Sequence, residues 1–488
     1  MSTGWGRTLS ASLAELTVAL GISPPLGAED VTVDAICDDS RDVGPGALFV
    51  AIPGAVHDGA DFVGEALDRG AVAVVSEPEL HPPVPHVRVE DARAALARLS
   101  AAFYGRPTEA LFTVGVTGTN GKTTVCQWIA HLLGIDRTVV VGTVANEARG
   151  LRAVTTPSSR IVQRIAAEAR DGGARNLVLE ASSIGLAQRR LDAVDFDVGL
   201  FTNLTHDHLD LHGTMDAYLR AKRILFEGLR PTAHAVANGD DPATEAILAG
   251  CRAKPVRYGF APGADLQGIE PVYDKRSVRC DLRWQGERAP LEVPRPGRHS
   301  LMNALGAACI GALCGLSLGE IVERLRSAPP VEGRLQFFSR GDGITAVLDF
   351  AHTPDALQRA TEAVRPPVGR LFVVFGCPGE SDRAKRPAMG AVAGEAADLS
   401  VVTSDNPKHE DPEAILDAIE VGLRSTGGRW ERMVDRAAAI RRAVDRATAG
   451  DVILVAGKGH ETYQIVGDAF LPHSDRSVLE NLGFTSEP

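Results

Sequence analysis

The last third of the chain alternates continuous apolar runs with segments of helical character. The runs are ITAVLDF (344–350), LFVVFGC (371–377), LSVVTSD (399–405) and DVILVAG (451–457). Apolar runs of this length suit strands that are buried on both faces, and intervening helices favour parallel connections between them. The alternation therefore predicts a Rossmann-like, doubly wound α/β domain, in which ligands bind beyond the carboxyl ends of the strands.

The whole chain is too long for one hydrophobic core, because 488 residues correspond to about three domains. Glycine and proline punctuation separates a small N-terminal α/β region (1–106), a central region (107–334) and the C-terminal region (335–488). Hydrophobic residues make up 44% of the chain, which is enough to fill three cores. We therefore expect a three-domain α/β protein.

Charge and cysteine content limit the possible binding partners of the chain and the cellular compartment in which it is expected. The net charge of -12 argues against a nucleic acid or an anionic membrane as partner. The seven cysteines form no C-x-x-C pair, which fits free thiols in a reducing compartment. We find neither a signal-like N-terminus nor an apolar run long enough to cross a bilayer. We therefore expect a cytoplasmic protein, monomeric, that acts on small molecules.

The central region opens with a strand, a glycine-rich loop and a helix, LFTVGVTGTNGKTTVCQWIAHLLG (111–134). Such a loop turns backbone N–H groups toward a phosphate, while its lysine adds a cation and its threonine can bind Mg²⁺. The pattern G-x-x-x-x-G-K-[ST] is incomplete, because Val116 occupies the first glycine position. An ordinary glycine-rich turn is the alternative, but the context predicts a P-loop ATPase domain. The predicted phosphate-binding residues are Gly118, Thr119, Asn120, Gly121, Lys122, Thr123 and Thr124.

Two more polar clusters follow apolar runs in the central region. NLVLEASS (176–183) ends on Glu180 and Ser182, and residues 206–212 hold three histidines and two aspartates. A capping loop is the structural alternative for the second cluster. Glu180 and His208 would suit a divalent ion near the phosphates, and oxygen ligands suit Mg²⁺ best.

In this order, the motifs resemble those of the Mur ligases, the ATP-dependent amide-forming enzymes of peptidoglycan precursor synthesis. The likeness is strongest to the type that adds the third residue of the stem peptide. It is carried by VTGTNGKTT (116–124), LEASS (179–183), FTNLTHDHLDLHGT (201–214), YLRAKRILF (218–226), GRHSLMNALGA (297–307), EGRLQ (332–336), LDFAHTPDAL (348–357), TSDNPKHEDP (403–412) and AGKGHETYQ (456–464).

The resemblance implies a ligase that uses ATP and Mg²⁺ to convert a carboxylate into an acyl phosphate, which an amine then attacks. It implies a metal-binding site formed by Thr123, Glu180, His208 and Lys222. Lys222 matches the lysine that family members carbamylate with CO₂, which turns a cation into an anion. The expected catalytic residues are Lys122, Lys222, His208 and Glu180, and the expected nucleotide contacts are Asn303 (adenine), Arg334 (phosphate) and Asp349 (ribose).

The resemblance also assigns the two other substrates to separate domains. Residues that match the uridine-diphosphate end lie in the N-terminal domain, and they are Ser40, Arg41 and His57. Residues that match the muramoyl-peptide side are Thr155, Thr156, Ser182, Gln188 and Arg190. Residues that match the incoming amino acid lie in the C-terminal domain, and they are Ser381, Asp405, Asn406, Lys408, Gly457 and Glu461.

The amino-acid site is where this chain departs from the family pattern. The family type has an arginine at each of two positions that Ser381 and Lys408 occupy here. Lysine lacks the planar fork with which arginine binds a carboxylate in a bidentate way. Arg383 could compensate for Ser381, and Ile184 replaces the histidine usual after the two serines.

Three accounts of the function follow. The chain could be a housekeeping tripeptide synthetase with a rearranged amino-acid site. It could be a relative recruited to another ligation, for example in specialised metabolism, with a different amine or carboxylate. It could be a nucleotide-binding scaffold without activity, although Lys122, Glu180, His208, Lys222 and Asp349 argue against this account. The first two accounts stay open at the level of sequence.

Overall fold

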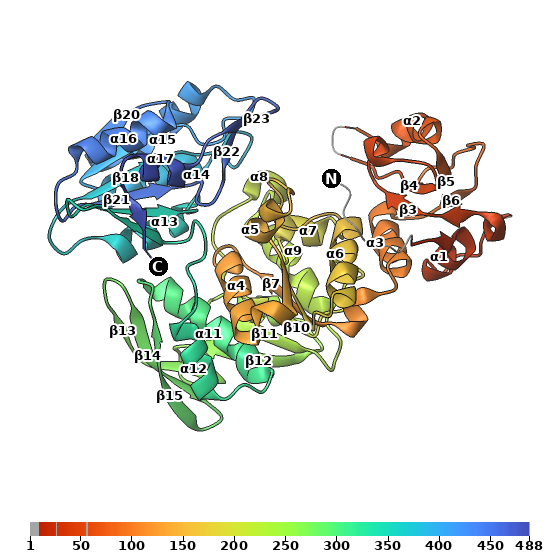
Figure 1. Cartoon of the computed structure of the whole chain (residues 1–488), viewed down its shortest axis with the longest axis horizontal. Coiled ribbons are helices and arrows are strands. Elements are labelled where there is room, and N and C mark those ends of the chain that lie inside the picture. Colours follow the sequence, from red (N-terminus) through yellow and green to blue (C-terminus); the bar gives the residue numbers. More distant parts are fainter. Residues whose placement is uncertain (1–8, 26, 55–56, 488) are drawn as a thin grey trace.

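The computed structural model describes residues 9–25, 27–54 and 57–487, and three successive parts of the chain each build a sheet of their own (Figure 1). We call these parts the N-terminal lobe (β1–β6), the middle lobe (β7–β15) and the C-terminal lobe (β16–β24). No helix in the described part of the chain is long and apolar enough to cross a membrane.

The N-terminal lobe contains four parallel strands in the order β3-β4-β5-β6 and a short antiparallel pair, β1 and β2. Helices α1 and α3 pack on one face of the sheet through Leu13, Leu96 and Leu99, and α2 packs on the other face through Val63 and Ala66. The element bounds are Ala11–Ser12 (β1), Leu13–Ala19 (α1), Thr32–Val33 (β2), Ala35–Cys37 (β3), Ala47–Val50 (β4), Val63–Asp68 (α2), Ala71–Ser76 (β5), His86–Arg88 (β6) and Ala92–Phe103 (α3).

The middle lobe is built on nine strands in the order β15-β14-β13-β12-β11-β10-β7-β9-β8. Along the sheet, every pairing from β8 to β13 is parallel. β14 pairs antiparallel with both β13 and β15, and this extension was not predicted from the sequence. The strand bounds are Phe112–Thr117 (β7), Thr138–Val141 (β8), Asn176–Glu180 (β9), Val198–Phe201 (β10), His234–Asn238 (β11), Lys254–Gly259 (β12), Leu266–Tyr273 (β13), Val278–Trp284 (β14) and Glu287–Val293 (β15).

Helices cover both faces of this sheet. One face is packed by α4, α11 and α12 through residues such as Ile129, Leu305 and Ile321, and the other by α6 and α9 through residues such as Ile165 and Phe226. The helix bounds are Lys122–Leu133 (α4), Thr143–Ala148 (α5), Ser159–Asp171 (α6), Ser183–Ala187 (α7), Leu209–His212 (α8), Met215–Glu227 (α9), Thr244–Leu248 (α10), Arg298–Leu313 (α11) and Leu318–Arg326 (α12).

The C-terminal lobe has seven strands in the order β20-β19-β18-β21-β17-β16-β24, parallel except for the antiparallel β16 and β24. A separate hairpin, β22–β23, lies beside it. The strand bounds are Gln336–Ser339 (β16), Thr345–Asp349 (β17), Leu371–Phe375 (β18), Leu399–Val402 (β19), Trp430–Arg432 (β20), Val452–Ala456 (β21), Tyr463–Val466 (β22), Ala469–Pro472 (β23) and Thr485–Ser486 (β24).

Helices α13 to α15 cover one face of the C-terminal sheet through Leu357, Met389 and Ile415, while α16 and α17 cover the other through Ile440 and Leu479. The prediction of a doubly wound α/β domain is thus confirmed, since the four apolar runs form β17, β18, β19 and β21. The helix bounds are Pro354–Val364 (α13), Lys385–Ala396 (α14), Pro412–Thr426 (α15), Arg436–Arg446 (α16) and Asp475–Asn481 (α17).

A buried ion pair supports the carboxyl end of this sheet. The guanidinium of Arg436 donates two hydrogen bonds to the carboxylate of Asp475, at 2.8 and 2.7 Å, and both side chains are fully buried. Arg436 also donates to the carbonyl oxygen of Ala456 and, at 3.5 Å, to that of Ser404. The pair therefore braces the two loops that follow β19 and β21.

We expect Asp475→Asn to destabilise the protein by about 3–5 kcal/mol, because it leaves a buried guanidinium without its counter-charge. Urea unfolding followed by circular dichroism measures the change. Glu480→Gln is the control, since it breaks the exposed pair with Arg476 on the same helix and should change the free energy of unfolding by at most about 1 kcal/mol. Equal effects of the two variants would contradict the prediction.

Candidate active site

The phosphate loop leaves β7 and turns directly into α4. Gly118 and Gly121 have φ angles of +148° and +87°, which side-chain-bearing residues rarely adopt. A Cβ atom on Gly118 would lie 1.8 Å from Oγ1 of Thr202, and one on Gly121 would lie 2.4 Å from Oδ1 of Asn303. Glycine is therefore required at both positions by backbone conformation and by space.

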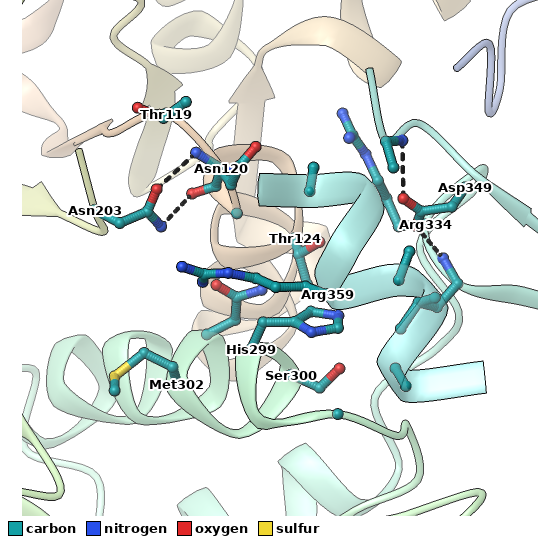
Figure 2. A pocket seen from close by; sticks show the side chains of 18 of the residues that line it. Thr119, Asn120, Thr124, Asn203, His299, Ser300, Met302, Arg334, Asp349 and Arg359 are labelled. Carbon is teal, nitrogen blue, oxygen red and sulfur yellow. Dashed lines mark hydrogen bonds between the residues drawn. The ribbon is translucent and has the colours of Figure 1, made fainter. Parts of the chain in front are cut away.

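The side chain of Asn203, which follows β10, holds this loop in place. The backbone N–H of Asn120 donates to Oδ1 of Asn203 at 2.9 Å, and Nδ2 of Asn203 donates to the carbonyl oxygen of Asn120 at 3.0 Å (Figure 2). Lys122 Nζ donates to the carbonyl oxygens of Gly118 and Thr119, both at 2.9 Å. Burial lowers the pKa of Lys122. The loop is thus preformed, with the ammonium group of Lys122 held against its own carbonyl oxygens.

Glu180, at the end of β9, connects several segments through one buried carboxylate. Its Oε2 accepts hydrogen bonds from Oγ1 of Thr123 (3.0 Å) and Thr143 (3.3 Å), and its Oε1 accepts one from the backbone N–H of Thr143 (2.8 Å). Arg334 donates to Oγ1 of Thr123 at 3.1 Å. The predicted contact of Arg334 therefore lies at the phosphate loop.

The two lysines predicted to be catalytic meet at Gly118. Lys222 is 1% exposed, its Nζ donates to the carbonyl oxygen of Gly118 at 2.8 Å, and it lies 4.1 Å from the ring centroid of Tyr218. Burial, reinforced by the charge of Lys122, holds the pKa of Lys222 well below its ordinary value. His208 lies beside Asp207 with φ of +54°, and burial lowers the pKa of its imidazole to about 4.

The donor set at the phosphate loop fits Mg²⁺. Within the described residues, no group of three or more His, Cys, Asp or Glu side chains could hold a metal ion by itself. Thr123 and Glu180 do offer adjacent oxygen atoms beside the phosphate loop. Mg²⁺ is usually held in proteins by one or two carboxylates together with substrate phosphates and water. A site completed by a nucleotide is consistent with both observations.

A cavity of about 970 Å³ extends from the phosphate loop to the C-terminal lobe. On the loop side it is lined by Lys122, Thr123 and Glu180, and on the opposite side by Asp349 and His352. The sequence analysis missed the lining residues His299, Met302 and Arg359, which come from α11 and α13 (Figure 2). Asn303, predicted on the adenine side, lies beside Gly121 and hence at the phosphate loop.

The segment between the middle and C-terminal lobes has a strained backbone. Leu335 has a φ of +40°, an uncommon conformation for a residue other than glycine. Asp349 stabilises it, since its Oδ2 accepts from the backbone N–H of Leu335 at 2.8 Å and its Oδ1 from that of Ala351 at 2.9 Å. The guanidinium of Arg334 lies 4.3 Å from the ring centroid of Phe350. Asp349 therefore already has a structural role next to the cavity.

The structure brings together the residues predicted to face the muramoyl-peptide. Thr156 Oγ1 lies 2.9 Å from Oγ of Ser182 and donates to the carbonyl oxygen of Glu180 at 2.7 Å. Arg190 donates to the carbonyl oxygen of Thr156 and to Oε1 of Gln188, both at 2.6 Å. A separate hydrogen bond joins Thr155 to Thr143, which itself contacts Glu180. Thr156, Ser182, Gln188 and Arg190 thus form one polar cluster at the backbone of Glu180, and Thr155 is joined through Thr143 to its carboxylate.

The residues predicted at the uridine-diphosphate end lie apart from that surface, in the N-terminal lobe. Ser40 Oγ donates to Glu65 at 2.9 Å, and the Arg41 side chain is 80% exposed and paired with Asp39. His57 is exposed, and the two residues before it, 55 and 56, lie outside the described residues.

A salt bridge that the sequence did not reveal joins the N-terminal lobe to α6 of the middle lobe. Arg160 pairs with Asp38 at 2.9 Å and with Asp42 at 2.6 Å. These two carboxylates flank Ser40 and Arg41, so the bridge fixes the predicted uridine-diphosphate segment against the middle lobe.

The turn after β19 contains one buried carboxylate oxygen without a hydrogen-bond partner, Oδ2 of Asp405. The neighbouring Asn406 is fully engaged, because its Oδ1 accepts from Lys458 Nζ and the N–H of Ile465 while its Nδ2 donates to Glu461. A Cβ on Gly457 would lie 2.6 Å from Oδ2 of Asp405, so a larger residue there would block that oxygen. Asp405 is thus the free acceptor of the turn.

Ser381 and Lys408, which occupy the two arginine positions of the family type, both lie in the C-terminal lobe. Lys408 has φ of +53°, its backbone pairs with β22, and no described residue bonds its ammonium group. Ser381 lines a second cavity of about 530 Å³ together with Glu380 and Glu410. Arg383 lines the same cavity as Ser381; its side chain is 75% exposed and lies 3.3 Å from Glu410.

Comparisons with known proteins match the chain along most of its length. Three family models match: "Mur ligase family, catalytic domain" at residues 32–104, "Mur ligase middle domain" at 116–311, and "Mur ligase, glutamate ligase domain" at 333–459. Two relatives are each a UDP-N-acetylmuramoyl-L-alanyl-D-glutamate–2,6-diaminopimelate ligase. The one from Chlorobaculum tepidum is 41% identical over 96% of this chain and 97% of its own length. The one from Geobacillus thermodenitrificans is 40% identical over 97% and 98%.

Solved structures agree with this similarity. A structure of a UDP-N-acetylmuramoyl-L-alanyl-D-glutamate–2,6-diaminopimelate ligase has a TM-score of 0.66 and 31% identity, covering 98% of this chain and all of the other. A MurF ligase from Thermotoga maritima in complex with ADP has a TM-score of 0.64 and 21% identity, covering 87% and 94%. The second likeness concerns the fold alone.

We expect Lys122→Ala to weaken ATP binding by about 1.5–3 kcal/mol, because a charge-assisted hydrogen bond to phosphate is lost. Isothermal titration with ATP in the presence of Mg²⁺ measures the affinity. Lys254→Ala, which removes an exposed lysine at the start of β12, is the matched control and should bind ATP like the parent protein. Unchanged affinity in Lys122→Ala would refute the assignment of the phosphate loop.

Proposed function

The chain belongs to the Mur ligase family, and we propose that it joins an amino acid to the carboxylate of a UDP-N-acetylmuramoyl-dipeptide, with release of ADP and phosphate. We assign the uridine-diphosphate end of the substrate to residues 1–106, ATP to residues 107–334 and the amino acid to residues 335–488. We further propose that it acts as a monomer in the cytoplasm, in peptidoglycan precursor synthesis.

One observation carries this proposal: the cavity that the middle and C-terminal lobes share. Lys122 and Thr123 approach it from the phosphate loop, while Asp349 and His352 approach it from the other lobe. Thr155, one of the residues assigned to the muramoyl-peptide, lines the same cavity. A reaction between ATP, a carboxylate and an amine needs all three within contact distance, and holding them there supplies much of the catalysis.

The first step is transfer of the γ-phosphoryl group. The substrate carboxylate attacks the γ-phosphorus, and ADP leaves with the electron pair of the broken P–O bond. Lys122 and the N–H groups of the loop bind the phosphate oxygens and offset their charge. Arg334 adds a second cation at Thr123. A Mg²⁺ ion bound by Thr123 and Glu180 would add charge stabilisation at the phosphates.

The second step is attack by the amine. We propose that Asp405 binds the α-ammonium group of the incoming amino acid, because its Oδ2 is a buried acceptor without a partner. This nitrogen must lose a proton to solvent before it can attack the acyl carbon. A buried carboxylate of this kind is stabilised by a charged donor. Asn406 and Glu461 hold the turn in shape through the hydrogen bond between them, and Gly457 leaves room beside Oδ2 of Asp405.

The identity of the amino acid has two candidates. The two relatives named above as 2,6-diaminopimelate ligases favour 2,6-diaminopimelate. The amino-acid site favours an amine whose carboxylate groups are placed differently. Ser381 and Lys408 replace the two arginines of the family type, and Arg383 is paired with Glu410. A lysine gives a point charge where arginine would give two parallel hydrogen bonds.

We also propose that Lys222 carries a carbamate in the active enzyme. Only a neutral amine attacks CO₂, and burial keeps the pKa of Lys222 well below its ordinary value. Its Nζ already contacts the carbonyl oxygen of Gly118 in the phosphate loop. Carbamylation would place an anion where two lysine ammonium groups otherwise repel each other, and this anion could share a second Mg²⁺ with His208.

A panel of amines tests the proposed reaction. We expect ADP release and an amide product of the correct mass when UDP-N-acetylmuramoyl-L-Ala-D-Glu is offered with 2,6-diaminopimelate, L-lysine or L-ornithine, and 2,6-diaminopimelate should be the best of them. Ser381→Arg should lower KM for 2,6-diaminopimelate if position 381 faces its carboxylate. Ser425→Arg on the exposed face of α15 is the control. No turnover with any diamino acid would refute the proposal.

Chemical rescue tests the carbamate. We expect Lys222→Ala to lower kcat by about 100-fold or more, because an electrostatic group at the reacting phosphates is lost. Formate or acetate should restore part of the activity by supplying a carboxylate in the space left behind. A ¹³C signal from enzyme-bound ¹³CO₂ should be present in the parent protein and absent from the variant. A labelled carbamate in Lys222→Ala, or wild-type kcat, would contradict the assignment.

A further inference from the structure

Two neighbouring residues of the middle lobe, His206 and Asp207, pair with charged residues of the C-terminal lobe. His206 Nε2 lies 2.8 Å from Oδ2 of Asp382, and Oδ1 of Asp207 lies 3.6 Å from Nζ of Lys385. Nε2 of His352 is 3.8 Å from Oδ2 of Asp207. We call this group of five residues the interlobe seam. It lies next to His208, at the edge of the shared cavity.

Lys385 is the unusual member of the interlobe seam. It is the first residue of α14 and is 2% exposed, yet no described residue accepts a hydrogen bond from its ammonium group. An ammonium group can donate three hydrogen bonds, and burying it without acceptors is costly. Asp207 offsets the charge from 3.6 Å, which is too far for a hydrogen bond. The side chain therefore retains donors that could bind an anionic ligand.

Lys385 lies between the shared cavity, which we assign to the nucleotide, and the turn after β19, which we assign to the amine. On one side, Asp207 and His352 line the shared cavity. On the other side is the buried thiol of Cys377, which follows β18. Burial raises the pKa of Cys377 to about 12, and the charges of Lys385 and Asp405 both reach this thiol. Lys385 is thus beside Asp207 at the cavity wall, and the next residue, Arg386, pairs with Glu410 of the turn that we assign to the amine, at 3.0 Å.

We propose that Lys385 is a further catalytic residue, which donates hydrogen bonds to the phosphoryl group of the acyl phosphate while the amine displaces it. This inference rests on the proposed function. In that step the amine nitrogen forms a bond to the acyl carbon, and the bond from this carbon to the phosphate oxygen breaks. The phosphate leaves with the electron pair, and the protons lost from nitrogen pass to the phosphate and to water.

The charge change in this step explains why a cation from the C-terminal lobe is useful. The carbonyl oxygen becomes negative in the tetrahedral intermediate, and the departing phosphate gains charge as the C–O bond breaks. Lys122 and Arg334 lie at the phosphate loop, where ADP is held. Lys385 approaches from the side of the amine turn, so it can follow the phosphate as it separates from ADP.

We expect Lys385→Met to lower kcat for amide formation by about 100-fold, the loss typical of one electrostatic donor removed from a transition state. KM for ATP and for the amine should stay close to the parent values. Lys385→Arg should recover part of kcat because it keeps the charge. Lys254→Met makes the same substitution at an exposed lysine and should leave kcat unchanged.

A purely structural role predicts a different pattern. If Lys385 only held the lobes together, Lys385→Met would raise the KM values rather than lower kcat, and His206→Gln, which breaks the neighbouring pair, would do the same. That result would overturn the inference. Should Lys385→Met fail to fold, Lys385→Gln, which also removes the charge, decides: a kcat loss above about tenfold at unchanged KM supports the inference, and a wild-type kcat overturns it.

Failure of the inference and failure of the proposed function give different results. If the parent protein releases no ADP with the muramoyl-dipeptide and any amine, the proposed function fails and this inference falls with it. If the parent protein is active and folded Lys385→Met keeps kcat within about threefold, the ligase function stands and only the role of Lys385 is refuted.

Discussion

The buried carboxylate of Glu180 holds together segments that are far apart in the sequence. It accepts hydrogen bonds from Thr123 in the phosphate loop and from Thr143 at the start of α5, while its backbone carbonyl oxygen binds Thr156. Through Thr123 it is connected to Arg334, where the C-terminal lobe begins. The phosphate loop, the substrate surface and the interlobe segment therefore share one anchor, so a shift at any of them is felt at the others.

The sequence predicts those parts of the candidate site that are formed by continuous segments of the chain. The phosphate loop, Glu180 and the amine turn each follow an apolar run, and a parallel sheet places such residues at one edge. The antiparallel strands β13 to β15 were missed, although VRCDLRW (278–284) alternates in the way of a strand exposed on one face. Their alternation was a usable signal.

The contacts between lobes could not be predicted in the same way. Arg160 with Asp38, and Lys385 with Asp207, are separated by many residues, and each pair depends on how two independently folded lobes dock. His299 and Met302 lie on a helix that is apolar all round, so no pattern marks the face that meets the cavity. Likewise, no sequence pattern shows that Asn406 is bonded to its neighbours while Oδ2 of Asp405 has no partner, because this depends on how the turn packs against the hairpin.

The turn after β19 divides two tasks between adjacent residues. Asn406 is committed to Lys458, Glu461 and the hairpin, whereas Asp405 Oδ2 and the ammonium group of Lys408 make no hydrogen bond within the described part of the chain. Position 408 can therefore be exchanged during evolution without unfolding the loop that presents it. A ligase built in this way can acquire a new amino-acid preference through single substitutions, while the residue that keeps the loop in shape stays under a separate selective constraint.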